Sequence, residues 1–251
     1  MSGPTVLIHR SAIDAVVFDM DGVVTRTATV HATAWAALFD AYLQAVADRG
    51  GARYRAFTQD DYLRFVDGKP RYDGVRDFLA SRGLSLPWGD PSDSPDALTV
   101  CGLGNRKDAC FRRLIAEQGV QSFPGAVALT AKLKQAGIRV AIISASTNMS
   151  QILEAAGVQG LFEAELDGEV AAELGLPGKP DPAVFVEAAR RLGAMPDRAV
   201  VVEDAIAGVE AGRRGAFALV IGVDGGGNRE ALAAAGADAV VADLGEVELG
   251  D

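Results

Sequence analysis

Five short apolar runs, rich in β-branched residues, alternate with helical patterns, and this alternation constrains the fold more than any other feature. The runs cover 15–19, 138–146, 198–204, 217–223 and 237–243. None has a polar face, so we expect strands that are buried on both sides. The helical patterns associated with them cover 126–136, 148–156, 182–192, 205–214 and 229–235. We therefore predict an α/β protein with a doubly wound, Rossmann-like parallel sheet covered by helices on both faces.

Residues 31–114 interrupt this alternation, because aromatic and charged residues are more common there and no strand pattern appears. A helical stripe of apolar and aromatic residues begins at His31 and ends before Gly50. Further helical patterns cover 59–66, 72–82 and 104–117, and a loop rich in Pro, Asp and Ser covers 84–97. We predict a core domain of residues 1–28 and 120–251, with an inserted α-helical domain of residues 29–119.

The charge balance argues against broad binding to nucleic acids or anionic membranes. The chain has 24 Lys and Arg against 34 Asp and Glu, a formal net charge of −10. The two cysteines, Cys101 and Cys110, match no zinc or redox motif and are expected to be reduced. No stretch reaches the roughly 18 apolar residues of a membrane span, and the first 14 residues lack a signal-peptide core. We predict a cytoplasmic protein with no nucleic-acid or membrane partner.

Polar side chains stand where three of the predicted strands end. Asp19 ends the first strand, Ser144 ends the second, and Glu203 and Asp204 end the strand predicted over 198–204. Lys179 precedes a helix in the connection between them. Ligands of an open parallel sheet bind outside the carboxyl ends of its strands. Any one of these acids alone could be a helix cap, but together they predict one site at one sheet edge.

The pair Asp19 and Asp21 suits phosphoryl transfer. In extended backbone, residues i and i+2 point to the same side, about 6.6 Å apart, so the two carboxylates can flank one phosphorus atom. One carboxylate can attack the phosphorus, and the other can protonate the leaving oxygen and then deprotonate the next nucleophile. Gly22 permits the tight turn that follows.

An attacking carboxylate and a phosphate repel each other, by roughly 4 kcal/mol for two charges 4 Å apart at an effective dielectric of 20. A hard cation removes this repulsion, and Mg²⁺ prefers a few carboxylates together with phosphate oxygens. Asp19, Asp204 and Glu203 are candidate ligands. Lys179, Ser144 and the backbone N–H groups of residues 145–148 are candidate phosphate-binding groups.

Four segments in order, "FDMDGVV", "ISAS", "GKPDP" and "VEDAIAG", resemble the motifs of the haloacid dehalogenase-like phosphotransferases. The resemblance covers the core, about two thirds of the chain. It implies that Asp19 is the nucleophile and Asp21 the acid/base. It also implies that Ser144 and Lys179 bind phosphate, and that Mg²⁺ is held by Asp19, Asp21, Glu203 and Asp204.

Within that superfamily, "FDMDGVVTRTATVHATAWAAL" is similar to the opening of the β-phosphoglucomutase-like group. Members of that group convert β-glucose 1-phosphate to glucose 6-phosphate through glucose 1,6-bisphosphate, under a helical cap. The resemblance implies a monomer or weak dimer that acts on a sugar phosphate. The candidate phosphate- and substrate-binding residues are Thr27, His31, Gly68, Arg71, Lys107, Ser144, Ala145, Asn148 and Lys179.

Alternatives remain open for several of these residues. Arg71 and Lys107 could bind a remote phosphate or could be solvated surface charges, and His31 could orient Asp21 or be an ordinary helix residue. Thr147 stands where the group often has Lys, and the links at 84–97 and 169–180 are longer than usual. The main alternative function is a phosphatase for a small sugar phosphate, and an inactive interaction module is a third hypothesis.

Overall fold

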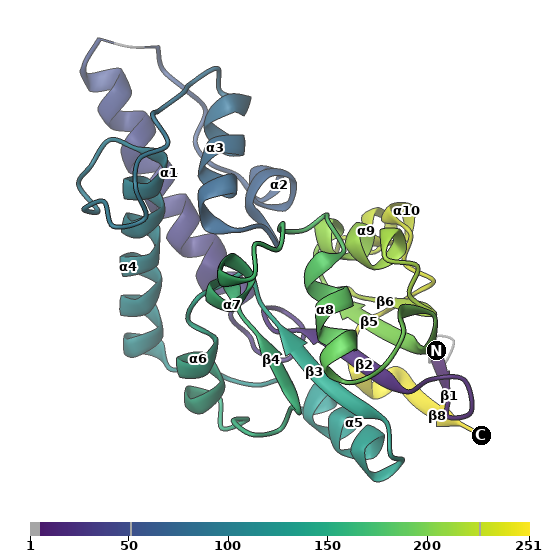
Figure 1. The fold of residues 1–251 in the computed structure, drawn as a ribbon. Helices are drawn as coiled ribbons and strands as arrows, with labels where there is room; N and C mark the ends of the chain where they lie inside the picture. Colours follow the sequence, from purple (N-terminus) through teal and green to yellow (C-terminus); the bar gives the residue numbers. More distant parts are fainter. Residues whose placement is uncertain (1–5, 51, 226) are drawn as a thin grey trace. The chain divides into compact units, whose positions relative to one another are not determined.

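The computed structural model describes residues 6–50, 52–225 and 227–251 of the 251-residue chain (Figure 1). Contacts between Cα atoms divide the chain into two compact units. We call the unit that ends at Arg26 and resumes at Val120 the sheet unit, and Thr27–Gly119 the insert. The first five residues of the predicted core domain lie outside the described part. Among the described helices, none is both long enough and apolar enough to cross a membrane.

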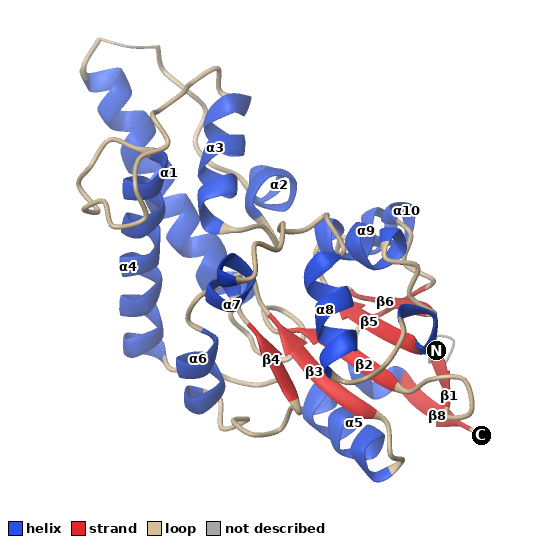
Figure 2. Cartoon of the chain, in the orientation of Figure 1, coloured by secondary structure: helices blue, strands red, loops and turns tan. Residues whose placement is uncertain are grey.

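Parallel strands dominate the described part of the sheet unit. Six of them form one sheet in the order β4-β3-β2-β5-β6-β7 (Figure 2). These strands are β2 (Ala15–Asp19), β3 (Arg139–Ile143), β4 (Ala164–Leu166), β5 (Ala199–Glu203), β6 (Leu219–Val223) and β7 (Ala239–Val241). The helices of this unit are α5 (Pro124–Gln135), α6 (Met149–Ala155), α7 (Gly168–Glu173), α8 (Ala183–Arg191), α9 (Ile206–Arg214) and α10 (Arg229–Ala235). A separate parallel pair joins β1 (Val6–His9) to β8 (Val247–Gly250).

The central strands are buried on both faces, as their apolar composition predicts. Every residue of β2 and of β5 is buried. On one face, Phe185 of α8 packs in a cluster with Val17 and Val201. Strands of this kind have no polar face that could be left in water, so helices must cover both sides. The predicted α/β class, with a parallel sheet and a helical insertion after its first strand, is confirmed.

Strand pairing brings the ends of β2, β3 and β5 to one edge of the sheet. Asp19 is paired with Ile143 in β3, and Phe18 with Val202 in β5. Ser144 therefore follows β3 directly beside the end of β2, and Glu203 ends β5 on the other side of β2. The polar residues that the sequence places at strand ends thus share one edge.

Some elements had no clear signal in the sequence. Strands β1, β4 and β8 and helix α7 were not among the expected elements. Strand β4 has only three residues, and α7 has no buried residue, so neither has a repeating pattern of apolar residues in the sequence. The strand expected over 138–146 ends at Ile143, because the chain leaves the sheet at Ser144.

The insert is helical and has its own hydrophobic core. Its elements are α1 (Ala28–Asp48), α2 (Gln59–Asp61), a π-helical turn (Tyr62–Val66), α3 (Arg71–Ser81) and α4 (Val100–Gln118). Its core includes Trp35, Phe39, Phe78 and Leu103, and the tilted rings of Phe39 and Phe78 have 3.9 Å between their centroids. Helix α4 starts earlier than the pattern suggested, because Thr99 caps it by accepting a hydrogen bond from the N–H of Gly102.

Candidate active site

Asp19 lies at the carboxyl end of β2, where the chain turns sharply out of the sheet. Its side chain is buried, and its Oδ2 accepts a hydrogen bond from the backbone N–H of Asp21 at 2.9 Å. The turn closes with the N–H of Gly22 donating to the carbonyl of Thr25 at 2.8 Å. Gly22 has φ +84°, a conformation that other residues rarely adopt. The turn therefore holds one carboxylate oxygen of Asp19 in a fixed orientation.

Lys179 links the two acids at the ends of β2 and β5. Its Nζ donates to Asp19 Oδ1 at 2.5 Å and to Glu203 Oε1 at 2.8 Å. All three side chains are almost fully shielded from water. An ammonium buried between two carboxylates leaves this group with one net negative charge.

Asp19 and Lys179 both have a raised pKa, but for different reasons. Burial raises the pKa of Asp19 well above its usual range, and the Glu203 carboxylate adds to the rise. Burial alone would lower the pKa of Lys179, but the carboxylates of Asp19 and Glu203 outweigh it and raise that pKa. The carboxylates thus favour the charged form of Lys179, while burial and Glu203 disfavour the ionised form of Asp19, which further positive charge nearby would favour.

Asp19, Glu203 and Asp204 together offer a set of ligand atoms for a metal ion. One carboxylate oxygen from each lies within 4.8 Å of the others. Two glycines make room for this arrangement: a Cβ on Gly22 would overlap the Asp204 carboxylate, and a Cβ on Gly208 would overlap Glu203. Three carboxylates with one lysine carry excess negative charge, and oxygen ligands of this kind suit a hard divalent cation. The residues present therefore fit a divalent metal.

Ser144 connects the second predicted carboxylate to the loop that follows β3. Its Oγ donates to Asp21 Oδ2 at 2.8 Å and accepts from the N–H of Ser146 at 3.0 Å. Ser146 Oγ in turn accepts from the N–H of Asn148 at 3.2 Å. The side chain of Asp21 is thus directed to Ser144, and it does not belong to the described carboxylate cluster that Asp19, Glu203 and Asp204 form.

Comparison with protein families agrees with this arrangement. The model of the haloacid dehalogenase-like hydrolases matches residues 13–215 of this chain. The chain belongs to this family. Enzymes of the haloacid dehalogenase-like family typically use a divalent metal, and the acidic cluster of Asp19, Glu203 and Asp204 is the place where this member could hold one.

Relatives of this haloacid dehalogenase-like protein include phosphomutases. It is 44% identical over 240 residues to a protein named β-phosphoglucomutase from Mycobacterium bovis. The matched region covers 94% of this chain and 91% of that protein. It is also 45% identical over 250 residues to an uncharacterized glycosyl hydrolase of Mycobacterium tuberculosis, of which it spans 18%. Among solved structures, a β-phosphoglucomutase from Clostridium difficile superposes with a TM-score of 0.72 at 25% identity, covering 94% of this chain and 93% of that one.

Three of the candidate residues in the insert lie on or next to α1 and on α4. Thr27 precedes α1 and is buried. His31 stacks on Phe111, with 3.9 Å between the ring centroids, and its Nδ1 lies 2.5 Å from Nζ of Lys107. Lys107 is 5% exposed, so it is not a solvated surface charge. The structure thus brings His31 and Lys107 together inside the insert.

Gly68 and Arg71 lie at the start of α3. Gly68 has φ +68° in the turn that precedes the helix, and Arg71 is the first helical residue. Arg71 forms an ion pair with Asp108 of α4, 3.1 Å from Nη1 to Oδ1, and its side chain is 18% exposed. Arg71 is therefore a half-buried, ordered cation.

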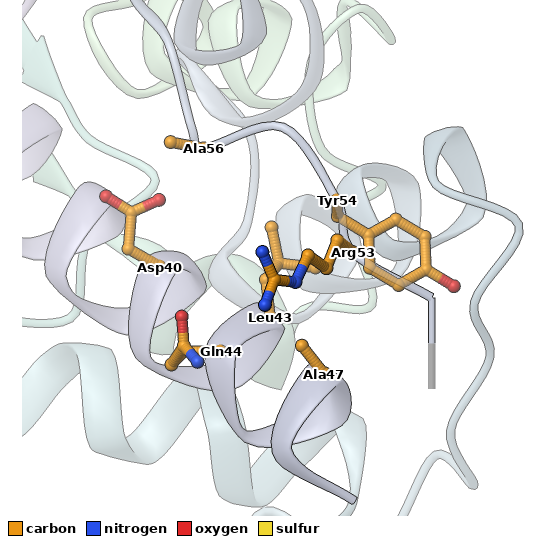
Figure 3. A pocket seen from close by; sticks show the side chains of 7 residues that line it. All are labelled: Asp40, Leu43, Gln44, Ala47, Arg53, Tyr54 and Ala56. Atoms are coloured by element: carbon orange, nitrogen blue, oxygen red, sulfur yellow. The ribbon is translucent and has the colours of Figure 1, made fainter. Parts of the chain in front are cut away.

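A pocket of 490 Å³ also lies in the insert, beside α1. Figure 3 shows Arg53 and Tyr54 on the segment that passes the helix, with Asp40 at one end of the pocket. The pocket is lined by Asp40, Leu43, Gln44, Ala47, Arg53, Tyr54 and Ala56. None of the candidate site residues is among these seven, so the pocket is separate from the predicted substrate-binding positions.

Sequence reasoning overlooked several residues that shape the site. Gly208 makes room for Glu203, and it could have been noticed because it closes the motif "VEDAIAG". Ser146 supports the loop after β3, but its role depends on a turn geometry that spacing does not reveal. Asp108 had no signal at all, because its partner Arg71 is far away in the sequence.

Proposed function

We propose that this protein is a Mg²⁺-dependent β-phosphoglucomutase, which converts β-glucose 1-phosphate to glucose 6-phosphate through glucose 1,6-bisphosphate. The observation that carries this proposal is the 44% identity, over 94% of the chain, to a protein of that name. The convergence of Asp19, Lys179, Glu203 and Asp204 at one sheet edge supports phosphoryl transfer as its chemistry.

In the first step, a carboxylate oxygen of Asp19 attacks the C1 phosphorus of glucose 1,6-bisphosphate, and glucose 6-phosphate is the leaving group. A bond forms between that oxygen and phosphorus, and the bond from phosphorus to the sugar oxygen breaks. Asp21, in its protonated form, donates a proton to the departing oxygen. The product of this step is an aspartyl phosphate on Asp19 and a free sugar hydroxyl.

In the second step, Asp21 takes a proton from the 6-hydroxyl of β-glucose 1-phosphate. That oxygen attacks the phosphorus, which restores the Asp19 carboxylate and forms glucose 1,6-bisphosphate again. Ser144 and Lys179 would hold the transferring phosphoryl group through hydrogen bonds, and Lys179 keeps Asp19 in place throughout. Asp19, Glu203 and Asp204 would hold Mg²⁺, with Asp21 as a further predicted ligand, and the ion would supply the positive charge that offsets the repulsion between carboxylate and phosphate.

The insert would act as a cap, with its boundaries at residues 29–119, and would recognise the rest of the substrate. A mutase has to hold a second, remote phosphate, and Arg71 and Lys107 are the cations we assign to it. Thr27, His31 and Gly68 would shape the substrate-binding side of the cap, while Ala145 and Asn148 would do so on the sheet unit.

The second candidate function is hydrolysis of a small sugar phosphate with the same residues. The match to a family model described as a hydrolase favours it. The two functions differ in the acceptor, because water ends the reaction as free phosphate whereas a sugar hydroxyl gives the isomerised product. Exclusion of water by a closed cap decides between them.

A coupled assay tests the proposal. The enzyme receives β-glucose 1-phosphate, trace glucose 1,6-bisphosphate and Mg²⁺, and glucose 6-phosphate and free phosphate are followed together. We expect glucose 6-phosphate with little free phosphate. Free phosphate alone would indicate the phosphatase. An Asp19→Asn variant that still forms glucose 6-phosphate or free phosphate would reject Asp19 as the nucleophile.

A further inference from the structure

The carboxylate of Asp108 lies between two arginines of the insert. Its Oδ1 is 3.1 Å from Nη1 of Arg71, and its Oδ2 is 2.5 Å from Nη2 of Arg112, one turn further along α4. The side chain of Asp108 is 11% exposed, whereas that of Arg112 is 56% exposed. Two guanidinium groups and one carboxylate give these three residues one net positive charge. Without Arg112, the pair of Arg71 and Asp108 has no net charge.

The close approach of α3 and α4 is built into the sequence around this group. A Cβ on Gly104 would lie 2.6 Å from the ring of Tyr72 and 3.4 Å from Cγ of Arg71. The Tyr72 hydroxyl donates to Oδ1 of Asn105 at 2.9 Å, and the Asn105 amide donates to the carbonyls of Pro91 and Asp93. Asn105 therefore links α4 both to the start of α3 and to the long loop before α4, and this keeps Asp108 within reach of Arg71.

We propose that Arg112 is a further cation of the remote phosphate subsite, beside Arg71 and Lys107, and that Asp108 positions Arg71 and Arg112 as one anion-binding pair. This inference rests on the proposed function, because it deepens the role given there to Arg71. Its ligand class is a phosphate monoester dianion. Arg71, Lys107 and the Asp108 carboxylate together carry one net positive charge, and Arg112 raises this to two, which matches the charge of a dianion.

Asp108 has a use in this arrangement although it repels an anion. A guanidinium on an exposed helix samples many rotamers, and fixing it costs entropy when a ligand binds. The carboxylate holds Arg112 and Arg71 in one geometry in advance, and each guanidinium carries five N–H donors, more than one carboxylate oxygen can use. Asp108 is therefore a positioning residue rather than a ligand.

The test is a binding titration with full-length protein that carries Asp19→Asn, so that the ligand is not turned over. Glucose 1,6-bisphosphate is the two-phosphate probe, and inorganic phosphate is the single-phosphate probe. Arg112→Gln is expected to weaken bisphosphate binding about threefold to tenfold and to change phosphate binding less than twofold. Arg112→Lys, which keeps the charge, should recover most of the affinity.

The matched control is Arg113→Gln, which removes the same charge from the next residue of α4. Arg113 is 68% exposed and faces Glu117, so this variant should bind both probes as the parent does. An equal loss for Arg112→Gln and Arg113→Gln, or no loss for Arg112→Gln, would overturn the inference.

A double-mutant cycle tests the positioning role of Asp108. In an Asp108→Asn background, Arg112 is no longer held, so Arg112→Gln should change bisphosphate affinity less than twofold. The same loss in both backgrounds would contradict the role of Asp108.

Arg71→Ala distinguishes failure of the remote phosphate site from failure of the role given to Arg112. If it leaves bisphosphate binding unchanged, the remote site itself is wrong; if it weakens binding and Arg112→Gln does not, only the present inference fails.

Discussion

Replacing Lys179 with methionine tests the electrostatics of the site without any assay of activity. Methionine keeps most of the side-chain length but removes the ammonium between Asp19 and Glu203. At an effective dielectric of about 20, each of the two contacts contributes roughly 6 kcal/mol of gross Coulomb attraction. The cost of burying the ammonium offsets much of this, and breaking a buried ion pair typically lowers stability by about 3–5 kcal/mol.

The assay is thermal unfolding of wild-type and Lys179→Met protein, in EDTA and in saturating Mg²⁺. At about 2–4 °C per kcal/mol for a chain of this size, the variant should unfold about 6–20 °C lower in EDTA. The variant leaves two buried carboxylates without their cation, so Mg²⁺ should raise its Tm by more than it raises that of the wild type.

The control for this experiment is Lys107→Met, which removes another buried ammonium that lies against His31 and outside the carboxylate cluster. Its Tm should respond to Mg²⁺ as the wild type does. The reasoning is refuted if Lys179→Met is as stable as the wild type in EDTA, or if Mg²⁺ stabilises both proteins equally.

Three further predictions concern single residues. Asp21→Ala should lower kcat by about 10²–10⁴-fold with a smaller change in KM, since the residue moves a proton; steady-state kinetics showing the reverse would remove it from that role. Gly22→Ala should reduce the Mg²⁺-dependent rise in Tm, because a Cβ would overlap the Asp204 carboxylate; an unchanged rise would show that Asp204 does not bind metal. Asp61→Asn should destabilise the protein by about 1–3 kcal/mol at pH 7 in urea unfolding. Burial raises the pKa of Asp61, but hydrogen bonds from Arg82 and Thr58 lower it overall, so its contribution is present above the usual pKa of about 3.9 and is lost as the pH falls below it. The difference between the two proteins should therefore shrink below about pH 4, and a constant difference would contradict this.

The α/β class could be read from the sequence because the signal for it is local. Strands such as β2 and β5 are short apolar runs without a polar face, and that pattern permits only a position between two layers of helices. The strand ends follow from the same runs, so the sequence alone assigns Asp19, Ser144 and Glu203 to one edge of the sheet. The insert was equally visible, since the alternation of strands and helices stops after the first strand.

What side chains do at that edge was decided only by the tertiary structure. Lys179 pairs with both Asp19 and Glu203, and Ser144 donates to Asp21. The same holds within the insert, where Lys107 is buried against His31. Each of these contacts joins residues that are at least 24 positions apart, and it depends on how the chain is folded around them. Periodicity along a sequence reports which face of an element is buried, because that is a property of neighbouring residues. Which charged groups meet is a property of the packed chain, and it is set by strand pairing and by the glycines that let segments approach.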